Sequence, residues 1–507
     1  MIRHFPWAGC VLLVLASACS GTFHSKACST DDDCGGGLVC AQQQGGQLAC
    51  ASPSTAPIRI GMSAPVSGPS QELGTEMKEG VSLAFDAQNA SGGVRGRKLQ
   101  LEFRDDEYRP DLAEAAAREL LNVTDLTGQP ARCPTTTTPV VAGQTPVSSD
   151  ALARGPNAVL ALLGNVGTPT MVRTAPIAVE TGTLFFGAFT GASRILRDTA
   201  AGPCNRYIFN VRASYAQEAR ATLEYFFTAR LPDARHLISF DQNDSFGQAG
   251  YDGLVAAYIG LKGPFQSPAN PDEPIKRLRY ARDDQSSVPA QAQGAISYLE
   301  QLLQSDPGQH VVGIFMTDTY GPAVDFITRL RTWQYANDAE QTSLQKAQRL
   351  TLIFSNVSFV GPNSLASRLR DAGTVQTAQG PKPFTDGVFV SQVVPNYDND
   401  TSDTVAEYRK RIQAVGATPS FTSLEGYIAA RVFISGLLAH TGPLTPQALV
   451  DTFEKLPNLS LGLGAASGFS TDNHNYSKSV WGTSITADGQ FQSRYFWSDG
   501  TSIQLFE

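Results

Sequence analysis

Residues 58–110 read IRIGMSAPVSGPSQELGTEMKEGVSLAFDAQNASGGVRGRKLQLEFRDDEYRP, and this stretch decides the fold. Its opening, 58–62, is typical of a buried strand, and a loop of proline and glycine follows at 65–69. Apolar residues then recur at helical spacing over 77–85. Residues 99–103 alternate between apolar and polar, which predicts a second strand that runs into acidic residues.

The alternation of strands and helices continues toward the C-terminus. Further strands are predicted at 159–164, 184–186, 236–240, 311–316, 350–355 and 387–393, and helices at 111–122, 217–229 and 292–303. This order predicts an α/β fold with parallel sheets that are covered on both faces. In such sheets, ligands bind in the loops beyond the carboxyl ends of the strands.

Length, composition and net charge restrict the class of protein. A chain of 507 residues is too long for one ordinary core, so we expect at least two domains. Hydrophobic residues make up 42% and charged residues 17%, which is typical of a folded globular protein. The net charge of −8 predicts no basic face, so nucleic acid is not expected as a partner.

The N-terminus predicts an export signal. Arg3 precedes a short apolar run at 11–15, which is too short to span a bilayer. Residues 16–19, ASAC, resemble the lipobox of bacterial lipoproteins, although alanine opens it where that family usually has leucine. An ordinary signal peptide is the alternative. We expect residues 1–18 to be removed and Cys19 to carry lipid that anchors the chain to a membrane, facing the periplasm.

Cysteine usage agrees with export, because disulfides form in oxidising compartments. Residues 19–57 should form a cross-linked leader and a linker, and they contain Cys28, Cys34, Cys40 and Cys50. The sequence does not choose among the three possible pairings. Zinc is disfavoured because no C-x-x-C spacing occurs. We predict another disulfide between Cys133 and Cys204, the only cysteines after residue 57, with two buried thiols as the alternative.

The remaining stretches carry no catalytic pattern. Three segments interrupt the alternation of strands and helices and are expected to be insertions: 124–156, 264–274 and 335–348. No P-loop, HExxH or GxSxG motif occurs, and the histidines show no metal spacing. The acidic run 105–107 fits a capped strand end better than a metal or acid/base site. We therefore expect no catalysis, no cofactor and no metal.

Five segments together resemble one known family. Besides residues 58–110, they read LLGNVGTPT (162–170), LFFGAFTGASRILRD (184–198), ISFDQNDSFGQAGYDG (238–253) and SLEGYIAARVFISGLLAHTGPLTPQALVDTFEKL (423–456). In this order they resemble type I periplasmic binding proteins, and in particular the leucine/isoleucine/valine-binding receptors of ABC transporters. The resemblance extends over residues 58–507, with insertions.

The resemblance implies two Rossmann-like lobes joined by a three-strand hinge. It places the crossings near 210–214, 392–395 and 468–480. Lobe one would then comprise 58–212 plus 395–470, and lobe two 213–394 plus 475–507. It also implies a monomer that binds a small molecule between its lobes and delivers it to an ABC permease of the inner membrane.

The family's binding loops map onto particular residues of lobe one. Thr168 stands where a helix begins, so its hydroxyl and the helix dipole suit the carboxylate of an amino acid; a plain helix cap is the alternative. Thr190 matches a second hydroxyl donor, and Ala188 and Phe189 would supply backbone contacts. Ser67 in the first loop completes the predicted ligand contacts of this lobe.

In lobe two, Tyr215 and Tyr320 resemble aromatic positions that close over the ligand, with burial in the core as the alternative. The family's ammonium-binding acid would follow the strand at 350–355, but Asn356 begins that loop and no acid is present. Asp318, one loop earlier, is the candidate replacement. Because this family acid is missing, the ligand could equally be an amide, a carboxylate or another small polar molecule.

Three other functions stay open at this stage. A ligand sensor of the same fold, acting on a signalling partner, is the first alternative to a transport receptor. An enzyme is disfavoured by the missing motifs. A surface adhesion module is suggested only by the cysteine-rich leader.

Overall fold

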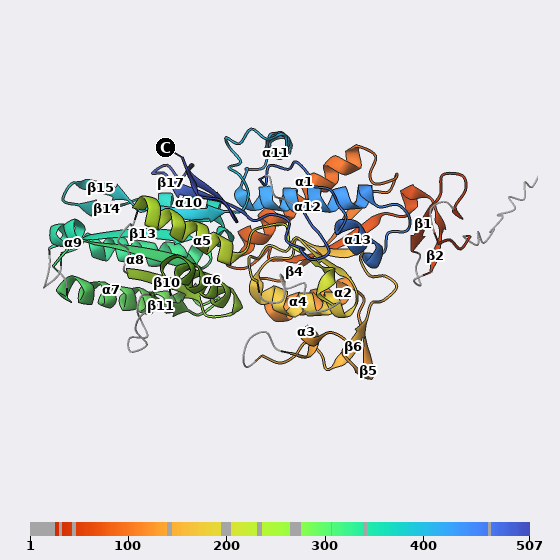
Figure 1. The fold of residues 1–507 in the computed structure, drawn as a ribbon, viewed down its shortest axis with the longest axis horizontal. Helices are drawn as coiled ribbons and strands as arrows, with labels where there is room; N and C mark the ends of the chain where they lie inside the picture. Colours follow the sequence, from red (N-terminus) through yellow and green to blue (C-terminus); the bar gives the residue numbers. More distant parts are fainter. Residues whose placement is uncertain are drawn as a thin grey trace, which may run out of the picture.

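A computed structural model describes residues 26–29, 33–42, 47–138, 144–193, 204–230, 236–263, 275–305, 307–337, 342–464 and 468–506. Two lobes lie side by side, each built on one sheet (Figure 1). The predicted signal peptide, Cys19 and the segment 264–274 lie outside the described residues. Among the residues described, no helix is both long and apolar enough to cross a bilayer.

Lobe one is built on a five-stranded parallel sheet. In spatial order its strands are β4 (Leu99–Asp105), β3 (Ile58–Ala64), β7 (Ala161–Leu163), β8 (Leu184–Phe186) and β9 (Ile208–Phe209). Its helices are α1 (Gln71–Ala90), α2 (Pro110–Leu120), α4 (Thr168–Glu180), α11 (Asp403–Ala414), α12 (Phe421–Ala439) and α13 (Pro446–Phe453). The central strands are short and apolar because helices cover them on both faces.

Close packing of α1 on α12 joins the two ends of the sequence in this lobe. A Cβ at Gly80 would lie 1.9 Å from the carbonyl oxygen of Ser423, and one at Gly426 would lie 2.4 Å from that of Met77. Only glycine allows the two backbones to approach so closely. The late helices therefore complete the first lobe, as Figure 1 shows for the blue helix α12 beside the orange α1.

Lobe two is built on an eight-stranded sheet. In spatial order its strands are β11 (Ile275–Tyr280), β10 (His236–Gln242), β12 (His310–Thr317), β13 (Leu350–Asn356), β16 (Val388–Gln392), β17 (Ser479–Ile485), β18 (Phe491–Ser498) and β19 (Gln504–Leu505). The first five strands are parallel, which confirms the predicted α/β class. The last three are antiparallel additions that the sequence did not indicate.

Helices cover the parallel part of this sheet. They are α5 (Tyr215–Tyr225), α6 (Ser245–Lys262), α7 (Val288–Ser305), α8 (Tyr320–Gln334), α9 (Ser343–Arg349) and α10 (Pro362–Ala372). A hairpin, β14 (Thr374–Thr377) and β15 (Gly380–Pro383), projects beyond the sheet. In the expected insertion at 335–348, the structure describes residues 335–337 and 342–348, and most of the second part belongs to α9.

The chain passes between the lobes three times. It leaves lobe one after β9, returns after β16 to form α11–α13, and re-enters lobe two at β17. The first and third crossings pair with each other, since the amide of Tyr476 donates to the carbonyl of Asn210 at 2.8 Å and that of Ser477 to Val211 at 3.1 Å. The lobes are therefore joined by bonded extended segments.

The cysteine-rich leader forms a small hairpin of β1 (Val39–Gln42) and β2 (Leu48–Ala51) at the far end of lobe one (Figure 1). Disulfides join Cys28 to Cys40 and Cys34 to Cys50, which selects one of the three pairings. These bonds occupy the four sulfurs that a zinc ion would need, and three of the cysteines form the leader's own apolar cluster.

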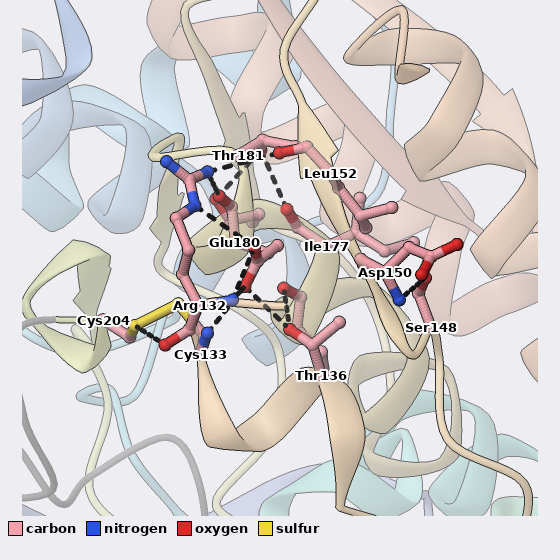
Figure 2. A network of polar contacts seen from close by, with 12 residues as sticks. Arg132, Cys133, Thr136, Ser148, Asp150, Leu152, Ile177, Glu180, Thr181 and Cys204 are labelled. Carbon is pink, nitrogen blue, oxygen red and sulfur yellow. Dashed lines mark hydrogen bonds and ion pairs between the residues drawn. A yellow bond between two sulfur atoms is a disulfide. The ribbon is translucent and has the colours of Figure 1, made fainter. Parts of the chain in front are cut away.

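The insertion at 124–156 is a hairpin arm of β5 (Thr124–Pro130) and β6 (Asp150–Ala153) with the short helix α3 (Pro134–Thr137). Figure 2 shows how it is attached to lobe one. A disulfide joins Cys133 to Cys204, the pair expected from the sequence. Beside it, the buried carboxylate of Glu180, at the end of α4, accepts hydrogen bonds from the amides of Arg132 at 2.9 Å and Cys133 at 2.7 Å.

Removing the disulfide by Cys133→Ser with Cys204→Ser should lower the free energy of unfolding by about 2–4 kcal/mol, because the unfolded chain gains conformational freedom. The amides of Arg132 and Cys133 should stay protected from hydrogen exchange, since Glu180 still accepts from them. Adding Glu180→Gln should remove that protection. Unfolding by denaturant and hydrogen exchange measure both effects, and early exchange in the serine variant alone would contradict this account.

Candidate functional site

Two of the predicted threonines meet at the carboxyl edge of the first sheet. The hydroxyl oxygens of Thr168, at the start of α4, and Thr190, after β8, lie 2.7 Å apart, and both side chains are buried. Gly167 precedes the helix with a φ of 98°, and its amide donates to the carbonyl of Phe189 at 3.1 Å. This bond and that from the amide of Phe189 to the carbonyl of Asn165 at 2.8 Å hold the two loops in register.

A strained turn after β4 presents a tyrosine to the other lobe. Glu107 and Tyr108 have φ values of 52° and 62°, which non-glycine residues rarely adopt. Asp106 stabilises the turn: its carboxylate accepts from the hydroxyl of Ser63 at 2.6 Å and from the amide of Tyr108 at 3.0 Å. The carbonyl of Tyr108 accepts from Arg282 of lobe two at 2.9 Å. The acidic run thus caps the strand end, as the sequence favoured.

Aromatic rings from both lobes pack together at this boundary. Phe359, just after β13, lies with its ring centroid 4.8 Å from that of Phe189 and 6.0 Å from that of Tyr108, both in lobe one. It also packs against Phe246 of lobe two at 4.8 Å, and Phe246 lies 5.4 Å from Tyr215. Phe189 and Tyr215 were predicted as ligand contacts; Tyr108, Phe246 and Phe359 were not.

A buried charged cluster lies at the first crossing. The guanidinium of Arg212 pairs with Glu218 of α5 at 2.8 Å and with Glu425 of α12 at 3.4 Å. It also lies 5.3 Å from the ring centroid of Phe189 and 5.6 Å from that of Tyr215. Burial alone would lower the pKa of Arg212, but the carboxylates outweigh it and raise that pKa. Arginine therefore stays charged between the lobes.

Asp318 and Asn356 lie at the ends of β12 and β13, the edge of the second sheet that faces lobe one. Both are buried, and no hydrogen-bond partner for either side chain lies among the described residues. Burial raises the pKa of Asp318 well above its usual value. The neighbouring Tyr280 hydroxyl accepts from the amide of Thr319 at 3.3 Å. A cation placed beside Asp318 would oppose this effect of burial and favour the charged carboxylate.

Tyr320 forms a second contact between the lobes, and Ser67 lies in the loop of lobe one that contains Pro69, the partner of Tyr320. The hydroxyl of Tyr320 donates to the carbonyl of Pro69 at 2.6 Å and also contacts Glu72 of α1. Ser67 donates to Asp105 at 2.6 Å and is partly exposed. The structure therefore brings Thr168, Thr190 and Tyr215 together, and it gives Tyr320 and Ser67 partners within the protein.

Sequence reasoning missed Tyr108 and the Arg212–Glu218–Glu425 cluster. A signal was available for Glu425, because it is a lone acid at the start of the apolar run 421–439. The turn that places Tyr108 depends on backbone conformation, which residue types alone do not indicate.

Known proteins match this chain in two segments and in the overall fold. Residues 57–133 and 358–490 match the family model described as periplasmic binding protein. The fold also matches the structure of a possible leucine/isoleucine/valine-binding protein from Rhodopirellula baltica, with 27% identity over 87% of this chain and 97% of that chain and a TM-score of 0.64. Over these segments, and in its fold, the chain is similar to periplasmic binding proteins.

Two further proteins are similar to this chain, one in its fold and one over a short segment. A branched-chain amino acid ABC transporter protein from Thermus thermophilus, solved with bound valine, shares the fold with a TM-score of 0.59 and 13% identity, over 89% of this chain and 97% of that chain. Leu/Ile/Val-binding protein homolog 3 of Brucella melitensis is 37% identical over 71 residues, 14% of this chain. That match spans 19% of the relative's length, about a fifth.

Asp106 should make the stability of the folded chain depend on pH. Burial raises its pKa to about 7, although Ser63 and the amide of Tyr108 lower it, whereas an unfolded aspartate has a pKa of about 3.9. The folded chain therefore holds the proton more tightly, and the contribution of Asp106 to stability falls as pH rises from about 4 to about 7. Asp106→Asn should remove this loss, worth about 1–4 kcal/mol across that range.

Denaturant unfolding of both proteins between pH 5 and 8 measures the difference. Asp105→Asn is the matched control, because the hydrogen bonds of Asp105 lower its pKa despite partial burial and place its titration below this range. Parallel stability curves for the native chain and Asp106→Asn would show that Asp106 does not titrate as its burial implies.

Proposed function

We propose that this protein is an extracytoplasmic receptor that binds a small polar solute between its lobes and delivers it to an ABC permease. One observation carries the proposal: the hydroxyls of Thr168 and Thr190 pair at the start of a helix. Beside them, Phe359 of lobe two packs on Phe189, and the amide of Tyr215 donates to the carbonyl of Gly191. Closure of two lobes on a ligand at this place would bury it among aromatic and polar groups.

The chemistry of the boundary favours an amino acid or a related compound. Two hydroxyls beside a helix N-terminus suit a carboxylate. On the facing edge, the carboxyl of Asp318 has no partner among the described residues, so it suits an ammonium group. Relatives with names that specify leucine, isoleucine, valine or bound valine support this class.

The remaining parts of the proposal concern the cell. The match to the periplasmic binding protein model supports a periplasmic location and a permease as partner. We further propose that Cys19 carries the lipid anchor, that the chain acts as a monomer, and that it catalyses no reaction. Neither a metal nor a cofactor is needed by the groups described.

Binding of L-amino acids tests the ligand assignment. A thermal-shift screen of the twenty L-amino acids should identify at least one that raises the melting temperature, because a ligand of the folded state stabilises it. Calorimetry with that amino acid should then show a loss of about 1.5–3 kcal/mol for Thr168→Ala. Asp318→Asn should cost more, about 2–5 kcal/mol, because a buried ammonium is left without its partner.

Matched variants separate these contacts from general damage. Thr174→Ala removes another buried threonine from the same helix and should leave the affinity unchanged. The same holds for Asp325→Asn, a partly buried residue of α8 that pairs with Arg329. Binding that survives Asp318→Asn would reject Asp318 as the ammonium partner. A screen in which no amino acid shifts the melting temperature would reject the ligand class.

A further inference from the structure

A second cavity lies at the opposite end of lobe two from the lobe boundary. Its volume is about 490 Å³, within the range of small-molecule sites. It is lined by the first residues of β13 and β16 together with the end of α8, the hairpin strand β15 and the end of β17. These are the amino ends of the parallel strands, whereas Asn356 and Phe359 follow the carboxyl end of β13. The cavity is therefore separate from the site proposed above.

Arg331 lines this cavity with a buried guanidinium that is only 3% exposed. Its nitrogens donate to the side-chain oxygen of Gln334 at 2.9 Å and to the carbonyls of Leu352 at 3.2 Å and Asp386 at 2.5 Å. Its Nε has no partner among the described residues. The acceptors are all uncharged, so this buried cation forms no ion pair with a carboxylate of the described chain, an arrangement that costs free energy.

Thr385 is a second unsatisfied group in the same wall. Its side chain is 1% exposed, and its hydroxyl has no hydrogen-bond partner among the described residues. Buried hydroxyls are nearly always paired, so each exception needs a physical reason. A polar ligand atom that enters the cavity would supply one, because a small movement of the threonine would bring its hydroxyl to the ligand.

Positively charged side chains outnumber negatively charged ones in the wall of the cavity. Lys382 and Arg494 add two cations to Arg331, and Asp386 is the carboxylate among the lining residues. Lys382 pairs with Asp386 at 2.8 Å, whereas Arg494 donates to Ser484 at 2.8 Å and Gln492 at 2.6 Å, both uncharged. Three cations thus face one carboxylate, Asp386, among the described residues of the wall, in a chain with a net charge of −8.

The wall also has apolar surface. Leu352, Ile353, Phe389 and Ile485 line the cavity beside the cations. A neighbouring cavity of about 280 Å³ shares Tyr335 and Lys382 with it, along the hairpin of β14 and β15. An anionic head next to the cations and an apolar body against these side chains would therefore match both parts of the wall.

We propose that this cavity is a second ligand site, and that it binds a small organic anion with a carboxylate or phosphate head and an apolar body. Arg331, Lys382 and Arg494 attract the head, and the hydroxyl of Thr385 donates to it. The site lies within lobe two, so binding there does not require the lobes to close, and it is independent of whichever solute binds between them.

Calorimetry on the full mature chain tests the site with three probes. Benzoate and phenyl phosphate carry the anionic head, and benzamide is the uncharged control of the same shape. Benzoate or phenyl phosphate should bind at least tenfold more tightly than benzamide, and added salt should weaken the binding. Equal affinity for benzamide, or no binding of either anion, would overturn the proposal.

Two variants locate the binding. Lys382→Gln should weaken anion binding about two- to fivefold, as expected for a partly exposed charge, whereas Lys410→Gln removes an equal charge from α11 of lobe one and should have no effect. Thr385→Val should weaken anion binding about tenfold and raise the melting temperature of the empty protein, because it removes an unsatisfied buried hydroxyl. Anion affinity unchanged in both Lys382→Gln and Thr385→Val would place the anion elsewhere and reject the site.

Discussion

The charge of Arg212 is the constraint on which the two-lobed arrangement depends. It lies at the first crossing, with its side chain 1% exposed, and its two carboxylate partners come from opposite lobes. Glu218 is held in turn by the amide of Ser358 and the hydroxyl of Ser391, each at 2.7 Å. Removal of one partner from such a cluster leaves a buried charge uncompensated, which typically costs about 3–5 kcal/mol. The cluster thus ties α5, β16 and α12 to the crossing, and it sets Phe189 and Tyr215 on either side of the guanidinium.

The sequence predicted those parts of the fold in which local pattern and tertiary environment agree. Strands such as β3 and β13 are apolar because the sheet buries them on both faces, so their residue types reveal them. β11 reads IKRLRY, an edge strand with three cationic residues that is buried only at Ile275, Leu278 and Tyr280, so its pattern does not indicate a strand. The antiparallel strands β17 to β19 were also missed, and the crossings between lobes followed from family resemblance because no local pattern encodes them.

The same distinction applies to the candidate site. Thr168 was found because a threonine at a helix start has a local meaning, and Thr190 because the family resemblance marked it. Tyr108 was not found, because its position depends on two consecutive residues, Glu107 and Tyr108, with left-handed backbone conformation in a turn that Asp106 stabilises. The Arg212 cluster joins residues that are 6 and 213 positions apart in the sequence, so only the folded chain shows that they meet. Residue types therefore indicated single ligand contacts. The networks that join the two lobes are apparent only in the folded chain.

The paired crossings have a mechanical consequence. Because the backbone of 210–211 is bonded to that of 476–477, these two segments form a narrow ribbon and cannot slide past each other without breaking hydrogen bonds. A ribbon bends easily about the axis across its strands and resists shear along them. We therefore expect the two lobes to move relative to each other mainly by rotation about this ribbon rather than by sliding.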